Sequence, residues 1–148
     1  MRFYYSSILL LTVLTVLTVS SAIAHGRVET LDGAWSLQSG QYLDENQQWV
    51  DYQSRGLTAI KVIAGEYFSF TTMQQSEAAA PTLWAAASGR LVYDGTTYTE
   101  YPTLNSFDAS ASFTFEYQLE VLENGQIAWH TKRIENGELK ELEVWLKR

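Results

Sequence analysis

The chain of 148 residues contains no cysteine and only two histidines and two prolines. Without cysteine there can be no disulfide bond, no thiol nucleophile and no lipid-acceptor cysteine after the N-terminal segment. With His25 and His130 as its only histidines, the chain has little from which to build a metal site, and we expect no cofactor. Its stability must therefore come from burial and hydrogen bonding.

Positive charge is also scarce, because 10 Lys and Arg stand against 17 Asp and Glu, for a net charge of -7. Nucleic-acid binding and attraction to anionic lipid both require clustered Lys and Arg. We therefore exclude nucleic acid and anionic membrane surfaces as partners. A negative balance of this kind favours solubility and little non-specific adhesion.

The only long hydrophobic run lies at the N-terminus. Residues 1–24 have the pattern of a secretory signal peptide, with Arg2 as a minimal positive region, an apolar stretch and an Ala22-x-Ala24 cleavage site. We predict cleavage after Ala24, a single mature domain of residues 25–148 and a secreted or periplasmic location. After cleavage, no segment is apolar enough to cross a membrane. The alternative is an uncleaved anchor, because the apolar stretch is only somewhat shorter than the roughly 20 residues of a membrane span.

No segment shows a sustained helical period, and apolar and polar residues instead alternate over short stretches, as in antiparallel strands. Asp94–Gly95, Asn124–Gly125 and Asn136–Gly137 lie between such stretches, and each pair suits a two-residue hairpin turn whose central residues both take positive φ. The pattern predicts an all-β fold, an antiparallel up-and-down barrel of about 8–10 strands. The predicted strands are 33–38, 48–53, 57–63, 67–73, 86–93, 96–101, 112–122, 126–134 and 138–147.

Two stretches lack a strand pattern. Residues 39–48 are polar, with one glycine. Residues 74–83 hold a run of alanines and Pro81, which is compatible with a short helix, a lid over the barrel mouth or a disordered excursion.

Alternation assigns one face of most strands to the interior. In residues 113–121 every second residue is apolar, and the residues between them are polar. Closing about eight such strands leaves an interior just wide enough for packed side chains or one small ligand. The predicted inward residues are Ile60, Val62, Phe68, Phe70, Leu91, Tyr93, Phe113, Phe115, Tyr117, Leu119 and Val121.

The last strand has two possible inward faces, one with Val144 and one with Glu143 and Trp145. If Glu143 faces inward, its carboxylate needs a buried partner, and Arg133 on the neighbouring strand is the candidate. Glu100 would then be a second inward acid. The alternative is that these residues are surface charges.

Several motifs together point to a known family. Gly33-x-Trp35 opens the first strand, residues 61–70 and 89–100 form hairpin-like segments, and Leu142–Glu143–Val144–Trp145 closes the chain. With these motifs, residues 31–148 resemble the lipocalin-like domains of bacterial secreted proteins, within the calycin group. The resemblance implies a meander barrel of about eight to ten strands and a hydrophobic or amphipathic small ligand.

The resemblance also implies a role for Trp35, which would pack at the closed end of the barrel against a basic side chain of the last strand. Lys147 stands at the expected spacing, and Arg148 lies one residue further along, on the opposite face. A cation over an indole contributes about 0.5–2 kcal/mol.

Our leading hypothesis is an exported protein that binds a small apolar or amphipathic molecule in its barrel cavity. No convincing catalytic set is present, so an enzyme is the less favoured class. The expected wall residues are Phe68, Phe70, Tyr93, Phe113, Phe115, Tyr117 and Trp129, with Tyr98, Glu100 and Arg133 as orienting polar contacts.

The alternatives come from other classes of protein. One is a small barrel isomerase or hydrolase in which Glu100 or Glu143 works with His130 as a general acid–base pair. Another is a filled barrel that serves only as an interaction or structural module of the cell envelope. A carbohydrate-binding protein would stack sugar rings on exposed Trp49 or Trp84.

A metal site has one weaker candidate. If cleavage makes His25 the N-terminus, its amine and imidazole could chelate copper, with His130 as a third ligand. The simpler interpretation is that His25 is a terminal residue left by the protease.

Overall fold

The structure, a computed structural model, describes residues 30–107 and 112–148. The predicted signal peptide and its cleavage site lie outside the described residues and stay predictions. No helix that could span a membrane is found among the residues described. The elements are β1 Gly33–Leu43, β2 Trp49–Asp51, the short 3₁₀ turn η1 Gln53–Arg55, β3 Leu57–Ala64, β4 Tyr67–Gln74, β5 Thr82–Tyr93, β6 Thr97–Asn105, β7 Phe113–Val121, β8 Ile127–Glu135 and β9 Glu138–Lys147.

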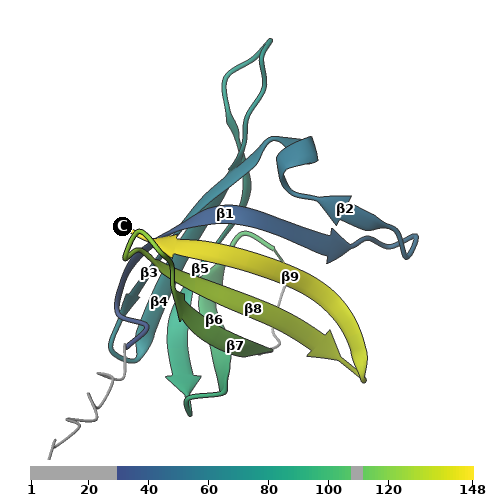
Figure 1. Cartoon of the computed structure of the whole chain (residues 1–148). Helices are drawn as coiled ribbons and strands as arrows, with labels where there is room; N and C mark the ends of the chain where they lie inside the picture. The colour runs from purple at the N-terminus through teal and green to yellow at the C-terminus, as the bar shows by residue number, and fades with distance from the viewer. Residues whose placement is uncertain (1–29, 108–111) are drawn as a thin grey trace, which may run out of the picture.

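The strands form one antiparallel meander that closes on itself. Strands β3 to β9 pair in chain order, β1 pairs with β3, and β9 returns to pair with β1. Eight strands, β1 and β3 to β9, therefore make a closed barrel, and β2 pairs with the far end of β1. Figure 1 shows β9 running beside β1. The predicted all-β antiparallel barrel is confirmed. Because β9 pairs with β1, the barrel has no unpaired edge strand where its two ends meet.

Strand β1 is longer than predicted because it has three partners. Its first half pairs with β3 and its second half with β2, while β9 pairs along most of its length. The stretch 39–48, predicted not to be a strand, is strand as far as Leu43, because these partners satisfy its backbone N–H and C=O groups. In the turn that follows, Asp44 Oδ1 accepts hydrogen bonds from the backbone N–H groups of Asn46 and Gln48.

The stretch 74–83 also differs from its prediction. Strand β4 continues to Gln74 and β5 begins at Thr82 rather than near residue 86, so these strands project beyond the rest of the barrel as a long hairpin (Figure 1). Residues 75–81 join them and form no helix. The predicted alanine run lies within this connection, and only the residues on either side of it, up to Gln74 and from Thr82, pair as strands.

Only one of the three predicted hairpin turns has the expected backbone at both positions. Asn136 and Gly137 join β8 to β9 directly, with φ angles of 52° and 80°. At Asp94–Gly95 and Asn124–Gly125 only the glycine has a positive φ, 99° and 80°. The loops there are longer than two residues. In both, the acid or amide oxygen of the first residue accepts backbone N–H groups of the loop.

Most residues predicted to face inward do so, but the prediction for β3 is wrong. Ile60 and Val62 are 43% and 44% exposed, while Lys61 between them is 3% exposed. Strand β3 has apolar residues on both faces, so its own pattern does not decide which face is buried. Tyr93 and Val121, which are 39% and 68% exposed, also face solvent rather than the interior.

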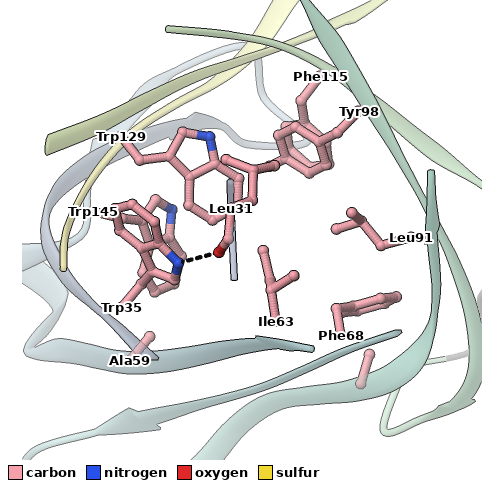
Figure 2. Close-up of a cluster of buried hydrophobic side chains, with 11 residues drawn as sticks. Leu31, Trp35, Ala59, Ile63, Phe68, Leu91, Tyr98, Phe115, Trp129 and Trp145 are labelled. Carbon is pink, nitrogen blue, oxygen red and sulfur yellow. Dashed lines mark hydrogen bonds between the residues drawn. The ribbon is translucent and has the colours of Figure 1, made fainter. Parts of the chain in front are cut away.

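Three tryptophan side chains pack together in the core of the barrel. Trp35, Trp129 and Trp145 are at most 2% exposed, and the rings of Trp35 and Trp129 meet edge to face at 5.2 Å. Trp35 Nε1 donates to the carbonyl oxygen of Leu31 at 2.8 Å, the bond drawn in Figure 2. Lys147 Nζ lies 5.5 Å from the centre of the Trp35 ring, so a lysine provides the cation that contacts this tryptophan.

Candidate functional site

A cavity of about 270 Å³ lies inside the barrel and opens to solvent. Its wall combines aromatic rings with buried charged groups. The rings are those of Phe70, Trp84, Phe107, Phe113, Phe115 and Trp145. The polar groups are those of Tyr52, Lys61, Thr72, Glu100, Arg133, Glu141 and Glu143, and Leu57 and Ala85 complete the wall.

A buried ion pair joins opposite walls of the cavity. Lys61 on β3 donates to Glu100 on β6, with 2.7 Å between Nζ and Oε1, and both side chains are 4% exposed. Burial lowers the pKa of Lys61, but the attraction of Glu100 and Glu143 outweighs it and leaves that pKa above its ordinary value. The lysine is therefore an ammonium ion inside the barrel.

Aromatic rings surround this ammonium ion. The distance from Lys61 Nζ to the ring centres is between 5.0 and 5.7 Å for Phe70, Tyr98, Phe115, Trp129 and Trp145. The electron-rich faces of such rings attract a desolvated cation. Figure 2 shows Tyr98, Phe115, Trp129 and Trp145 gathered around the interior. The interior of this barrel thus already stabilises one organic cation.

A second ion pair lies nearer to solvent. Arg133 Nε on β8 donates to Glu141 Oε2 on β9 at 2.7 Å, and Arg133 also pairs with the more exposed Glu135. Arg133 is the predicted candidate partner of an inward Glu143, but it pairs with Glu141 instead. The β8–β9 register explains the difference, because it sets Arg133 opposite Glu141 and Thr131 opposite Glu143.

Tyr52 connects the segment after β2 to this pair. Its hydroxyl donates to Glu141, and burial, followed by the charges of Glu141 and Glu143, raises its pKa, so the hydroxyl stays protonated. The ring rests against Gly40 of β1, where an added Cβ would lie 2.8 Å from Tyr52 Cδ2. The absent side chain at position 40 therefore makes room for Tyr52.

Glu143 is the charged group of the cavity that lacks an ionic partner. It faces inward with Trp145, is 9% exposed, and makes no ion pair with any described residue. Its Oε2 accepts from Trp145 Nε1 at 2.9 Å and from Thr131 Oγ1 at 3.2 Å. Burial and the neighbouring Glu141 raise the pKa of Glu143 to about 7, although Lys61 partly offsets this shift.

The structure distributes the predicted ligand-binding residues among three environments. The cavity wall contains Phe70, Glu100, Phe113, Phe115 and Arg133. Phe68, Tyr98 and Trp129 lie in the packed core instead. Tyr93 is exposed, and Tyr117 packs partly buried against Tyr98 with ring centres 5.9 Å apart, so neither lines the cavity.

Lys61 and Tyr52 are among the cavity residues that the predicted ligand-binding set did not include. Lys61 is charged, but it shares its strand face with Leu57 and Ile63, and this was a signal that its face could be buried. Tyr52 lies between β2 and η1, and nothing in the local pattern indicates that its ring returns to the barrel. Both were missed because their partners are distant in sequence.

His130 lies on the outer face of β8. Its Nε2 is 2.9 Å from Glu120 Oε2, and the two side chains are 41% and 52% exposed. The pairing of His130 with Glu100 or Glu143, on which the acid–base hypothesis depended, is absent from the described part of the chain. Among the same residues, no group of three or more His, Cys, Asp or Glu side chains is arranged to hold a metal ion. His25 lies outside the described residues.

No protein-family model matches the chain, and a search of curated proteins finds no match. The antiparallel barrel is observed in the structure itself, while membership of the lipocalin-like group stays a prediction.

Proposed function

We propose that this protein is an exported, lipocalin-like binding protein whose barrel cavity holds a small amphipathic molecule. The observation that carries the proposal is the cavity of about 270 Å³ whose wall presents aromatic rings and buried charges together. A space of this kind favours binding over a purely structural role, for which a fully packed barrel would suffice.

The size of the cavity limits the ligand. Pockets for drug-sized molecules measure about 300–1,000 Å³. A cavity of about 270 Å³ suits a smaller molecule, such as one with a single or fused aromatic ring or a short alkyl chain.

The mixed wall supports an amphipathic ligand rather than a purely apolar one. Rings such as Phe113 and Phe115 favour an apolar body. A ligand without polar atoms would displace water from Glu143 and Thr72 and leave these two side chains without the hydrogen bonds that the water made. This loss of hydrogen bonds weakens binding. A polar head in contact with these groups avoids that cost.

The first prediction is that the protein carries or takes up such a molecule. Native mass spectrometry of the protein isolated from its source should show a bound species of small mass. Because Trp145 lines the cavity, we expect ligands to change the tryptophan fluorescence of the purified chain in a saturable titration.

A matched pair of variants localises the site. Thr72→Phe places a ring in the cavity and should weaken binding about tenfold or more, because Thr72 is part of the wall and 9% exposed. Thr71→Phe adds the same ring on the exposed outer face and should leave binding unchanged. A ligand-free native spectrum, together with no fluorescence response to a panel of apolar and amphipathic compounds, would argue decisively against the proposal.

A further inference from the structure

The charges that line the cavity do not balance. Five charged residues contribute to the wall, two positive and three negative. Lys61 is matched by Glu100 and Arg133 by Glu141, each at 2.7 Å. Arg133 is further engaged by Glu135 at the rim. The negative charge of Glu143 is therefore left over when every group is ionised.

Glu143 also has an oxygen that the described residues leave available. Both of its hydrogen bonds, from Trp145 and Thr131, end on Oε2. No hydrogen bond among the described residues ends on Oε1, and the side chain borders the cavity. Glu143 is nine-tenths buried, has one oxygen without a hydrogen bond and lacks a counter-ion. A carboxylate in this state raises the free energy of the folded protein unless it takes up a proton or binds a cation.

On the basis of the proposed function, we infer that the cavity binds an amphipathic amine, whose protonated nitrogen is received by Glu143 and whose apolar body lies against the aromatic wall. An ammonium group supplies the two things that Glu143 lacks, a positive charge and an N–H donor for Oε1. The adjacent rings of Trp145 and Phe115 add attraction for a cation, as they do for Lys61.

An anionic head group is less compatible with the same wall. Its partners would have to be Lys61 or Arg133, and both already bind carboxylates. It would also add a second uncompensated negative charge beside Glu143. The cavity therefore discriminates among ligands of one size by the charge of their head groups.

Other charged and titratable groups face Glu143 from several elements. Lys61 on β3 and Arg133 on β8 have raised pKa values, because burial is outweighed by their acidic partners. Burial first, and then nearby carboxylates, raise the pKa of the Tyr52 and Tyr98 hydroxyls. The remaining two carboxylates, on β6 and β9, are held in the two ion pairs. The pKa of Glu143, about 7, places the change in its own charge between pH 6 and pH 8.

The experiment uses three probes with one aromatic body and different heads: 2-phenylethylamine, 2-phenylethanol and phenylacetate. Their affinities for the purified chain are measured by isothermal titration calorimetry from pH 5.5 to pH 8. At pH 8 the amine should bind at least tenfold more tightly than the alcohol, and phenylacetate should bind most weakly. Below pH 7 the affinity for the amine should fall by about tenfold per pH unit, because Glu143 must first release its proton. The affinity for the alcohol should stay nearly constant.

Two variants with the same change in net charge locate the effect. Glu143→Gln should reduce the affinity for the amine to that for the alcohol and remove its pH dependence. Glu116→Gln, on the exposed face of β7, should behave as the unmodified chain does. A measurement without any substitution is the proton count, and titrations of the amine at pH 6.5 in buffers of different ionisation enthalpy should show release of up to about one proton.

The outcomes separate this inference from the proposed function. If the alcohol or phenylacetate binds as tightly as the amine, or if Glu143→Gln leaves the preference for the amine intact, the amine assignment is wrong while the cavity still binds ligands. If none of the three probes and no member of the fluorescence panel binds, the proposed function fails with it.

Discussion

At the scale of single residues, Lys61 and Glu100 set the character of the interior. Both side chains are 4% exposed, so each charge has lost nearly all of its contact with water. Each ion compensates the other, and rings such as Trp145 at 5.0 Å cover the ammonium group. Removal of either side chain would leave the other as a buried, unpaired charge.

The second prediction follows from this dependence. Lys61→Met should destabilise the chain by roughly 3–5 kcal/mol, because it leaves the Glu100 carboxylate buried and unpaired. The double variant Lys61→Met/Glu100→Leu should recover most of this loss, because replacing both ions leaves no charge to compensate. Urea unfolding followed by circular dichroism gives both values. A double variant as unstable as the single one would contradict the pairwise account.

At this scale the sequence allows part of the site to be predicted. Glu100 and Arg133 are predicted polar contacts and both line the cavity, because each shares a strand face with a buried aromatic residue, Tyr98 or Trp129. Lys61 was placed outside, because β3 is apolar on both faces and the partner that makes its burial possible lies 39 residues away in sequence. Local periodicity carries no information about such a partner.

At the scale of elements, strands β5 and β6 approach unusually closely at Gly89. The β5–β6 ladder has an irregularity between Ser88 and Gly89, where Gly89 faces Pro102. A Cβ at Gly89 would collide with the carbonyl oxygen of Tyr101 and would lie 2.9 Å from the backbone nitrogen of Thr103. Both neighbours are backbone atoms, so neither strand can yield without losing pairing.

The third prediction concerns this crossing point. Gly89→Ala should lower the free energy of unfolding by roughly 1–3 kcal/mol or more, because the methyl group forces the two strands apart. Ser88→Ala, at the adjacent position, removes only an exposed hydroxyl that bonds to Ser69 and should change stability by about 0.5 kcal/mol or less. The difference between the urea midpoints of the two variants measures the close approach. Equal midpoints would show that β6 can shift away from β5 without loss of stability.

Element types were predictable where local chemistry decides them. The segment 113–121 and the turn at Asn136–Gly137 occur as their patterns predict. The second half of β1 and the early start of β5 were not predictable, because polar or alanine-rich residues form strand there only when a neighbouring strand offers its backbone. The lengths of strands in this barrel are thus partly determined by pairing with neighbouring strands and not by local sequence alone.

At the scale of the whole molecule, the two ends of the described barrel lie side by side. Strands β1 and β9 pair with Trp35 opposite Lys147, and the backbone N–H of Arg148 donates to the carbonyl oxygen of Ala34 at 2.9 Å. The barrel is therefore continuous around its circumference. The first and last strands of the described barrel meet at one of its eight strand interfaces.

The fourth prediction tests this continuity by circular permutation. A chain in which a short Gly/Ser linker joins Arg148 to residue 30, with new ends between Asn124 and Gly125, should fold to the same barrel, because no described strand is interrupted. We expect a stability within about 3 kcal/mol of the original and unchanged ligand binding. New ends between Leu142 and Glu143 would cut β9 and should abolish cooperative unfolding. A folded protein from the second permutant would contradict the importance of an unbroken β9.

The fold class was predictable at this scale, but the cavity was not. Short alternating segments separated by Asp-Gly and Asn-Gly pairs, together with the lack of any helical period, suffice to indicate a meander barrel. Whether its interior is full depends on the sizes of side chains that meet from opposite walls, such as Thr72 and Phe113, and on which groups remain hydrated. These are properties of the closed barrel rather than of any one strand.

The contact between Gly40 and Tyr52 has a consequence for the ancestry of this chain. A side chain at position 40 would expel the Tyr52 ring and so release Glu141 from its hydrogen bond. Position 141 is far along the chain from positions 40 and 52, yet a change at one of the three should be accepted only together with changes at the others. Lineages that descend from a common barrel should therefore keep or exchange the glycine, the tyrosine and the acid as one inherited unit. Such a unit can mark kinship after overall sequence similarity has faded.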